Sequence, residues 1–412
     1  MSETTLIHDR LRRLEIAGPA LEINGQPLGR LAARVGRTPF YAYDRAAITA
    51  RVAELRSALP TEVELHYAVK ANPMPAVVGH LAPRVDGFDV ASQGELLVAL
   101  DAGMAPRDIS FAGPGKTPIE LEAAVAAGIC VNAESLRELE RLAEIGRRTG
   151  WTPRVALRVN PDFELKGAGM KMGGAPRQFG IDAERIPAAI AAAHALGLGL
   201  EGLHVFCGSQ NLSAEAIIDA NRKTLELAGR LAASHRDGFR FVNIGGGYGI
   251  PYFPGEKRLD LGAVGTALGA SIADHRAALG DARVVIELGR YLVGEAGYYV
   301  CEVVDVKVSK GQTFAVVNGG LHHHLANSGN FGQVLRKNYP VVVGNRLDAP
   351  PGASAVTVVG PLCTPLDMVA DRVLLPELAI GDLIVVLQSG AYGYTASPQG
   401  FLSHPPPAEI LV

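Results

Sequence analysis

Short β-rich apolar runs alternate with Ala-, Leu- and Glu-rich stretches between about residues 65 and 290. The eight runs are ELHYAVK ending at Lys70, DGFDVAS around Asp89, DISFAG at residues 108 to 113, GICVNAE around Val131, RVALRVN around Arg158, EGLHVFCGS around His204, FRFVNIGGG around Ile244 and ARVVIELGR around Glu287. Strands that alternate with helices indicate a parallel sheet with helical crossovers. Eight such units predict an α/β fold, a closed TIM (β/α)8 barrel.

Capping signals predict where two of the intervening helices begin. Thr117 can cap a helix in which Glu120 completes a capping box, and Gly128 stands at the far end. Ser135 and Glu138 repeat the same spacing before a segment with helical apolar periodicity.

After about Glu295 the pattern changes to apolar runs with few helical stretches, which predicts a separate antiparallel β domain. The sequence thus predicts three parts. Residues 1–35 form an N-terminal segment that packs with the β domain, residues 36–294 form the barrel, and residues 295–412 form the C-terminal β domain.

Composition excludes several classes of protein. The 412 residues are 48% hydrophobic and 20% charged, and 39 Lys and Arg against 42 Asp and Glu give a net charge of -3. This composition is typical of a globular protein, and no basic block predicts binding to nucleic acid. No apolar run reaches the roughly 20 residues of a membrane span, and the polar start MSETTLIHDR does not resemble a signal peptide. We expect a cytoplasmic protein.

Reactive residues of a TIM barrel lie at the C-terminal ends of its strands. The first run ends in Lys70, the seventh in the glycines 245–247, and the eighth in Glu287 followed by Arg290. Each feature also has a purely structural interpretation. Lys70 could be a lysine at the barrel rim, the glycines could form a tight turn, and Glu287 could pair with Arg290. Together they suit pyridoxal 5'-phosphate, which needs an amine for its aldehyde, an anion cradle for its phosphate and a carboxylate at its pyridine nitrogen.

These motifs resemble those of the fold-type III pyridoxal-phosphate enzymes, the diaminopimelate and ornithine decarboxylase group with its alanine racemase-like barrel. The resemblance covers nearly the whole chain. Its carriers are HYAVKAN around Lys70, GFDVASQGEL with Asp89 and Glu95, LRVNPD with Arg158, QFGID at 178–182, HVFCGSQ, IGGGYG, ELGR, CTPLD at 363–367, and GAYGYTAS with Tyr392.

The resemblance implies a role for each matching residue. The residues it places around the cofactor are Lys70, Asp89, Arg158, His204, Phe206, Ser209, Gly245, Gly246, Gly247, Glu287, Arg290 and Tyr392. It makes Lys70 and Cys363 catalytic, and makes Arg290, Thr364, Asp367 and Tyr392 contact the substrate. The group forms homodimers in which the partner's CxxxD segment, here Cys363 to Asp367, completes each site.

Three positions depart from the family pattern. A histidine usually stands three residues before the phosphate-region serine, but here that residue is Phe206, with His204 on the same strand face. The usual EPGR is ELGR. The residue after Cys363 is usually acidic and binds the distal amine of the substrate, but here it is Thr364.

A hydroxyl cannot compensate the desolvation of a buried ammonium, which costs several kcal/mol. We therefore expect an amino acid substrate whose distal end is neutral, amidated or tethered to an acyl carrier protein. CTPLD resembles a sub-branch with decarboxylases of a carrier-tethered glutamyl group and decarboxylases found beside exosortase systems. Decarboxylation of free diaminopimelate for lysine biosynthesis is the second reading. A racemase on the same barrel and a catalytically silent binding or regulatory homologue are the remaining alternatives.

The resemblance assigns no role to several residues that stand out in the sequence. His322, His323 and His324 are consecutive, and in an extended segment they would point to opposite faces, so we expect no metal site and instead a substrate-facing or interface role. Arg336 and Lys337 follow in a loop and could contact an anionic substrate or simply be solvated. The cysteines 130, 207 and 301 lie far apart and are expected to be packing residues.

Overall fold

The structure is a computed structural model that describes residues 8, 10–11, 18–167, 169–329 and 337–412. It divides into two compact units. The barrel unit comprises Thr49–Ile250 and Arg258–Leu292, and the β unit comprises the described residues of Met1–Ile48, Pro251–Lys257 and Val293–Val412.

Eight parallel strands close into a barrel, which confirms the predicted fold. They are β4 (Val63–Ala68), β5 (Gly87–Val90), β6 (Ile109–Phe111), β7 (Cys130–Ala133), β8 (Arg154–Asn160), β11 (Gly199–Val205), β13 (Phe241–Gly246) and β14 (Arg283–Leu288). Each strand pairs with the next of this series, and β14 pairs with β4 to close the ring. Each of the eight predicted apolar runs overlaps one of these strands.

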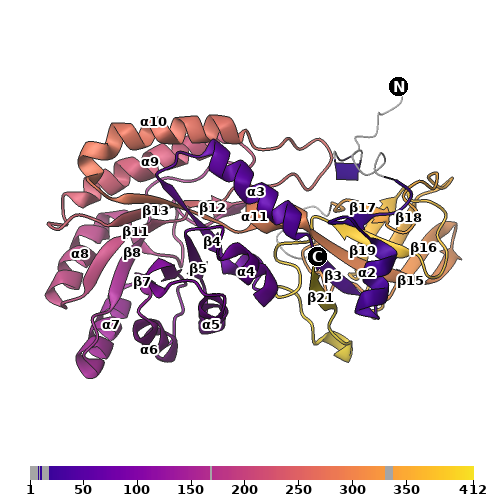
Figure 1. Ribbon diagram of the computed structural model, residues 1–412, viewed down its shortest axis with the longest axis horizontal. Helices are drawn as coiled ribbons and strands as arrows, with labels where there is room; N and C mark the ends of the chain where they lie inside the picture. The colour runs from indigo at the N-terminus through magenta and orange to yellow at the C-terminus, as the bar shows by residue number, and fades with distance from the viewer. Residues whose placement is uncertain (1–7, 9, 12–17, 168, 330–336) are drawn as a thin grey trace. The chain divides into compact units, whose positions relative to one another are not determined.

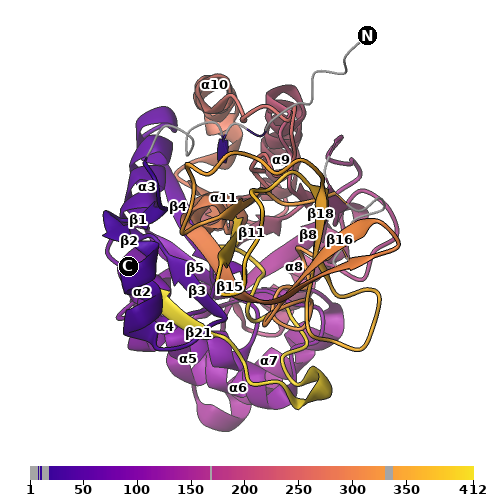
Figure 2. The same ribbon diagram turned by 90° about the vertical axis from the view of Figure 1, so that its right-hand side faces the viewer.

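Helices cover the outside of the strands, as Figures 1 and 2 show. They are α3 (Arg45–Ala58), α4 (Pro75–Leu81), α5 (Gln93–Asp101), α6 (Pro118–Ala127), α7 (Leu136–Thr149), α8 (Ile186–Ala195), α9 (Ala214–Ala232), α10 (Leu261–Leu279) and the short α11 (Arg290–Val293). Thr117 and Glu120 form the predicted capping box of α6. Ser135 caps α7 as predicted, but the Glu138 carboxylate accepts the N–H of Glu134 and not that of Ser135.

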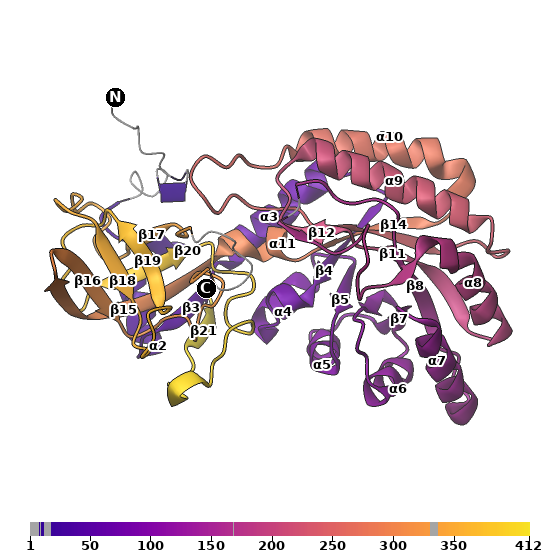
Figure 3. The same cartoon turned by 180° about the vertical axis from the view of Figure 1, so that it is seen from behind.

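The β unit is built on one mixed sheet (Figure 3). Its strands are β3 (Phe40–Tyr43), β15 (Gly297–Ser309), β16 (Gln312–Val317), β17 (Val341–Val343), β18 (Val356–Val359), β19 (Met368–Val373), β20 (Leu383–Leu387) and β21 (Ala408–Leu411). Most pairs are antiparallel as predicted, but β16 pairs with β18 and β3 with β21 in parallel. Long connections allow the parallel pairs, because the chain must return to the same end of the sheet.

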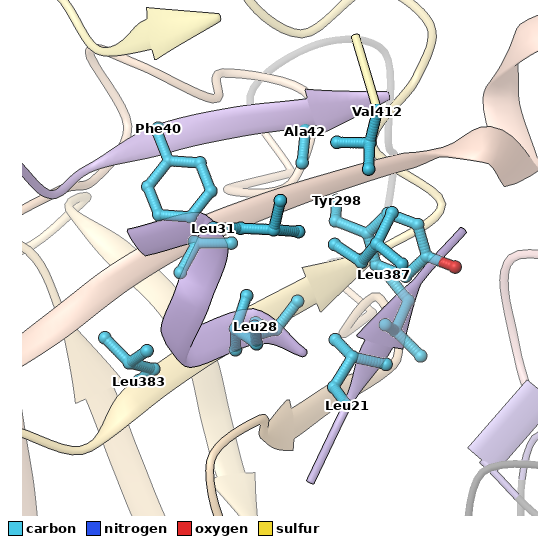
Figure 4. Packing of buried hydrophobic residues seen from close by; sticks show 12 residues of the cluster. Leu21, Leu28, Leu31, Phe40, Ala42, Tyr298, Leu383, Leu387 and Val412 are labelled. Atoms are coloured by element: carbon cyan, nitrogen blue, oxygen red, sulfur yellow. The ribbon is translucent and has the colours of Figure 1, made fainter. Parts of the chain in front are cut away.

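The first elements of the chain share the core of this sheet. They are β1 (Glu22–Ile23), β2 (Gln26–Pro27) and α2 (Leu28–Val35). Leu21, Leu28 and Leu31 pack against Tyr298 and Leu387 in one buried cluster (Figure 4). Strand β3, which the predicted boundaries assign to the barrel, pairs with β15 and β21.

Within the described residues, no helix combines the length and the apolar character that crossing a membrane would require.

Candidate active site

Lys70 lies directly beyond the C-terminal end of β4, in the 3-10 turn η1 (Val69–Ala71). Its side chain is 39% exposed, and its Nζ lies 3.8 Å from Oε1 of Glu287. The same Nζ lies 5.4 Å from the centre of the Phe206 ring. The amine at the strand end is therefore accessible and has a buried carboxylate and an aromatic ring beside it.

Glu287, near the end of β14, is 5% exposed and is the buried carboxylate of this group. Its Oε2 lies 3.0 Å from Nε2 of His204, which is also buried. Burial would raise the pKa of Glu287, but the hydrogen bond with His204 and the charge of Lys70 outweigh it and lower that pKa to about 2. Glu287 is thus a buried carboxylate whose lowered pKa favours the ionised form, beside the more exposed amine of Lys70.

Gly245 and Gly246 end β13 and Gly247 follows it, in a segment where side chains would be obstructed. Gly245 and Gly247 have φ of 73° and 75°, a region that favours glycine. A Cβ on Gly247 would overlap the carbonyl of Gly208, and one on Gly246 would overlap the carbonyl of Glu287. Ser209 follows Gly208 in the short strand β12 (Gly208–Ser209), so the structure brings the predicted phosphate-region serine and glycines together.

Arg158, at the C-terminal part of β8, is paired within the barrel rim. Its Nη1 donates to Oε1 of Glu134 at 2.8 Å, and its guanidinium lies 4.9 Å from the ring centre of Phe179. Glu134 also accepts the N–H groups of Gly113 (2.6 Å) and Gly180 (3.0 Å). Burial would raise the pKa of Glu134, but Arg158 and Lys116 hold it below the ordinary value.

Sequence reasoning missed Glu134, although it directly follows β7 and the strand-end rule that found Lys70 applies to it. It also missed the buried pair beside it, in which Lys116 Nζ lies 3.0 Å from Oε1 of Glu138. Glu134 and Glu138 follow β7. Through their contacts they connect the loop after β6 with β8 and with the loop before β10 (Ile181–Asp182).

Asp89 points into the barrel interior. One oxygen accepts the hydroxyl of Ser110, and the other lies 3.3 Å from Nδ1 of His66. Burial would lower the pKa of His66, but Asp89 outweighs it and raises that pKa. Ser110 in turn accepts from Asn132 at 2.9 Å. Asp89 therefore supports the barrel interior, and its contact with the cofactor stays a prediction.

Arg290, at the start of α11, belongs to the barrel unit, whereas the predicted residues Cys363, Thr364, Asp367 and Tyr392 belong to the β unit. Cys363 is exposed, whereas Asp367 is 3% exposed. The two oxygens of Asp367 accept the N–H groups of Leu321 (2.6 Å) and Leu362 (2.8 Å). Asp367 therefore joins two loops of the same chain, a role that the resemblance did not suggest. Tyr392 is half-buried and has a φ of 54°.

The three consecutive histidines lie in a turn and not in an extended segment, so the geometric premise of their prediction was wrong. The rings of His322 and His323 are 3.6 Å apart. His323 contacts the carbonyl of Pro405 (3.0 Å), and His324 contacts Ser389 (2.9 Å). Burial lowers the pKa of His322 and His324 to about 3 and that of His323 to about 4.

Other expectations concern single side chains. Lys337 lies 5.0 Å from the ring centre of Phe253, and Arg336 lies outside the described residues. The cysteines 130, 207 and 301 are buried. Burial raises the pKa of the first two to about 12 and that of Cys301 beyond the usual range, which suits packing residues.

The residues of the barrel unit fit pyridoxal phosphate. An accessible amine is present in Lys70, an ionised buried carboxylate in Glu287, and a glycine turn that side chains cannot enter at residues 245–247. Lys70 and Glu287 suit the aldehyde and the pyridine nitrogen. The glycine turn leaves space for a phosphate, and Ser209 beside it carries a hydroxyl that could bind one.

Comparisons with known proteins agree with this chemistry. The family described as "Pyridoxal-dependent decarboxylase, pyridoxal binding domain" matches residues 45–294. An L-glutamyl-[BtrI acyl-carrier protein] decarboxylase of Niallia circulans is 40% identical over 379 residues, which are 91% of this chain and 88% of that protein. A 2-[(L-alanin-3-ylcarbamoyl)methyl]-2-hydroxybutanedioate decarboxylase of Staphylococcus aureus is 32% identical over 381 residues, 90% of this chain and 93% of that protein.

Solved structures agree as well. Diaminopimelate decarboxylase from Helicobacter pylori, complexed with L-lysine, superposes with a TM-score of 0.82 and 28% identity, covering 93% of this chain and 94% of that chain. The extent of these matches, together with the lysine, carboxylate and glycine turn of the barrel, shows that the chain belongs to the family of pyridoxal-phosphate-dependent decarboxylases.

Proposed function

We propose that this decarboxylase removes the α-carboxylate of an L- or meso-amino acid whose distal end is neutral, amidated or thioesterified, delivered by an acyl carrier protein. The proposal rests on the polar side chains of the loop around Cys363, which are already hydrogen-bonded within the chain. The one carboxylate of this loop, Asp367, uses both oxygens to accept backbone N–H groups. The hydroxyl of Thr364 accepts the N–H of Leu366 at 3.3 Å. Asp367 is 3% exposed and Thr364 carries no charge, so this loop presents no exposed carboxylate to a distal ammonium.

The relatives support an uncharged link at the far end of the substrate. The Niallia circulans enzyme is named for a glutamyl group on a carrier protein, and the Staphylococcus aureus enzyme for an alanin-3-yl group joined through a carbamoyl. Both names describe an amino acid whose side chain continues through an acyl linkage and carries no free terminal amine.

When bound, pyridoxal phosphate supplies an electron sink for the electron pair left on Cα as carbon dioxide departs. Lys70 would hold the aldehyde of the cofactor, and Glu287 would hold a proton at the pyridine nitrogen. The phosphate region would be held by Ser209, the glycines 245–247, Arg290 and Tyr392, and Arg290 and Tyr392 would also face the substrate. The thiol of Cys363 would give its proton to Cα.

This arrangement implies a homodimer, because the proposed proton donor comes from the partner subunit. Cys363 is exposed, and so is Leu366 three residues later, which suits a loop that enters another subunit. We place the enzyme in the cytoplasm and in a biosynthetic route.

The test is carbon dioxide release by the holoenzyme from glutamate on an acyl carrier protein, compared with free glutamate, diaminopimelate, ornithine and lysine. We expect turnover of the tethered substrate and none with the Lys70→Ala variant. Turnover of diaminopimelate would make the protein a lysine-pathway enzyme and refute the proposed substrate. Exchange of the Cα proton without carbon dioxide release would indicate a racemase, and no turnover of any amino acid by cofactor-loaded protein would support a silent homologue.

A further inference from the structure

His204 and Phe206 are two residues apart in the sequence, but their side chains contact different residues. The ring of Phe206 lies near the Lys70 amine, at 5.4 Å from ring centre to Nζ. The ring of His204 instead reaches the Glu287 carboxylate at 3.0 Å. His204 was expected to supply an imidazole at the cofactor ring, but its one hydrogen-bonding neighbour among the described residues is a carboxylate.

The two oxygens of Glu287 are divided between these neighbours. Oε2 contacts Nε2 of His204, while Oε1 lies 3.8 Å from Nζ of Lys70. A carboxylate can rotate about its last bond and exchange its oxygens. The contact with His204 removes that freedom, because it is a hydrogen bond between two buried groups.

The second ring nitrogen of His204 indicates which atom carries the proton. Its Nδ1 is buried and has no hydrogen-bond partner in the part of the chain that the structure describes. A proton on Nδ1 would be an unsatisfied buried donor, which costs about 1–3 kcal/mol. An ionised carboxylate only accepts hydrogen bonds, so Nε2 is the ring nitrogen that carries a hydrogen and donates it to Oε2 of Glu287.

The polar residues level with His204 on the neighbouring strands are otherwise engaged. His204 is in register with Arg158 on β8 and with Asn243 on β13. Arg158 donates to Glu134, and the amide oxygen of Asn243 accepts the N–H of Gly245 at 2.8 Å. Of these three side chains, His204 is the one whose hydrogen bond goes to Glu287.

We propose that His204 is a positioning residue: its Nε2–H fixes Oε2 of Glu287 and thereby leaves Oε1 aimed at the ring nitrogen of the cofactor. This assignment concerns the cofactor and is independent of the proposed substrate. It also explains how an imidazole contributes although Phe206 occupies the position at which the family usually has a histidine.

The test compares His204→Gln, which retains a side-chain N–H donor, with His204→Ala, which removes it. We expect His204→Ala to raise the dissociation constant of pyridoxal phosphate about 10- to 100-fold, the range for a hydrogen bond to a charged group, and His204→Gln to raise it no more than about threefold. His194→Ala is the matched control. His194 contacts His235 and none of these residues, and its loss should leave the dissociation constant unchanged.

Two further measurements separate positioning from a general structural effect. In a Glu287→Gln background, His204→Ala should cause no further loss of affinity. In the ¹⁵N NMR spectrum of the apoprotein, Nε2 of His204 should carry a directly bonded hydrogen. Equal losses in His204→Gln and His204→Ala, additive losses in the double variant, or a His204 ring without a hydrogen on Nε2 would each overturn the proposal.

Discussion

Glu134 is the carboxylate of the barrel rim whose loss we expect to be most costly. Glu134→Ala removes the ion-pair partner of the buried Arg158 and the acceptor of two backbone N–H groups, those of Gly113 and Gly180. Breaking a buried ion pair on one side costs about 3–5 kcal/mol. Each unsatisfied N–H would add about 1–3 kcal/mol, but water entering the vacated space offsets part of this. We therefore expect a loss of about 4 kcal/mol in the free energy of unfolding of the barrel.

Trp151 makes this loss measurable in the barrel unit alone. It is the one tryptophan of the sequence, and it lies between α7 and β8. Urea unfolding of the apoprotein followed by tryptophan fluorescence therefore reports on the barrel. The control is Glu122→Ala, which breaks the exposed Arg148–Glu122 pair (2.6 Å) and should cost less than about 1 kcal/mol. If Glu134→Ala costs no more than this control, the network does not stabilise the barrel as argued.

The pH dependence gives an independent check. Because the pKa of Glu134 in the folded barrel is below its ordinary value of 4.5, its stabilising contribution is complete above that value. The contribution is lost as the pH falls through the lowered folded-state pKa. The difference in unfolding free energy between wild type and Glu134→Gln should therefore be largest at neutral pH and shrink in acid. A difference that stays constant into acid would contradict the ionised state of Glu134.

Three further predictions concern the cofactor, the substrate and the dimer. Gly247→Ala, which would push a Cβ against the carbonyl of Gly208 at a φ of 75°, should weaken pyridoxal-phosphate binding at least about tenfold in a fluorescence titration. An unchanged affinity for pyridoxal phosphate would refute the proposal that the glycines 245–247 hold its phosphate. Thr364→Glu restores an acidic group after Cys363 and should raise kcat/KM for diaminopimelate relative to the tethered glutamyl substrate; no change in that ratio would show that residue 364 does not select the distal end. Mixing Lys70→Ala with Cys363→Ala subunits should restore about a quarter of the wild-type rate, since random pairing gives half heterodimers with one complete site each. No recovery in mixed dimers would argue against shared sites.

The strands and their order follow from sequence pattern, because period and length of apolar runs determine them directly. Each of the eight runs overlaps a barrel strand, and the helix caps at Thr117 and Ser135 occupy their predicted positions. Lys70 and Glu287 could be predicted as site residues because the C-terminal ends of barrel strands lie close together, independently of the conformation of the loops. The family and its cofactor could be predicted from the motifs that these strand ends carry.

What the sequence did not reveal depends on contacts between distant residues. The second half of the Ser135 capping box fails because Glu138 faces the Lys116 ammonium and the N–H of Glu134. The histidine turn at 322–324 was mistaken for an extended segment, since its geometry follows from N–H groups that converge on the carbonyl of Gly320. Nothing local marks Asp367 as the acceptor of an N–H group 46 residues away.

The pairing of β3 with β21 has a consequence for the order in which the protein folds. Phe40 is in register with Ala408, so this edge of the sheet joins residues from near the two ends of the sequence. During synthesis, all of the barrel unit leaves the ribosome before residues 408–411 do. The local βα contacts of the barrel can form at that stage, whereas β3 must wait for its last neighbour. A ribosome stalled near residue 390 should therefore carry a protease-resistant barrel and an incomplete β unit.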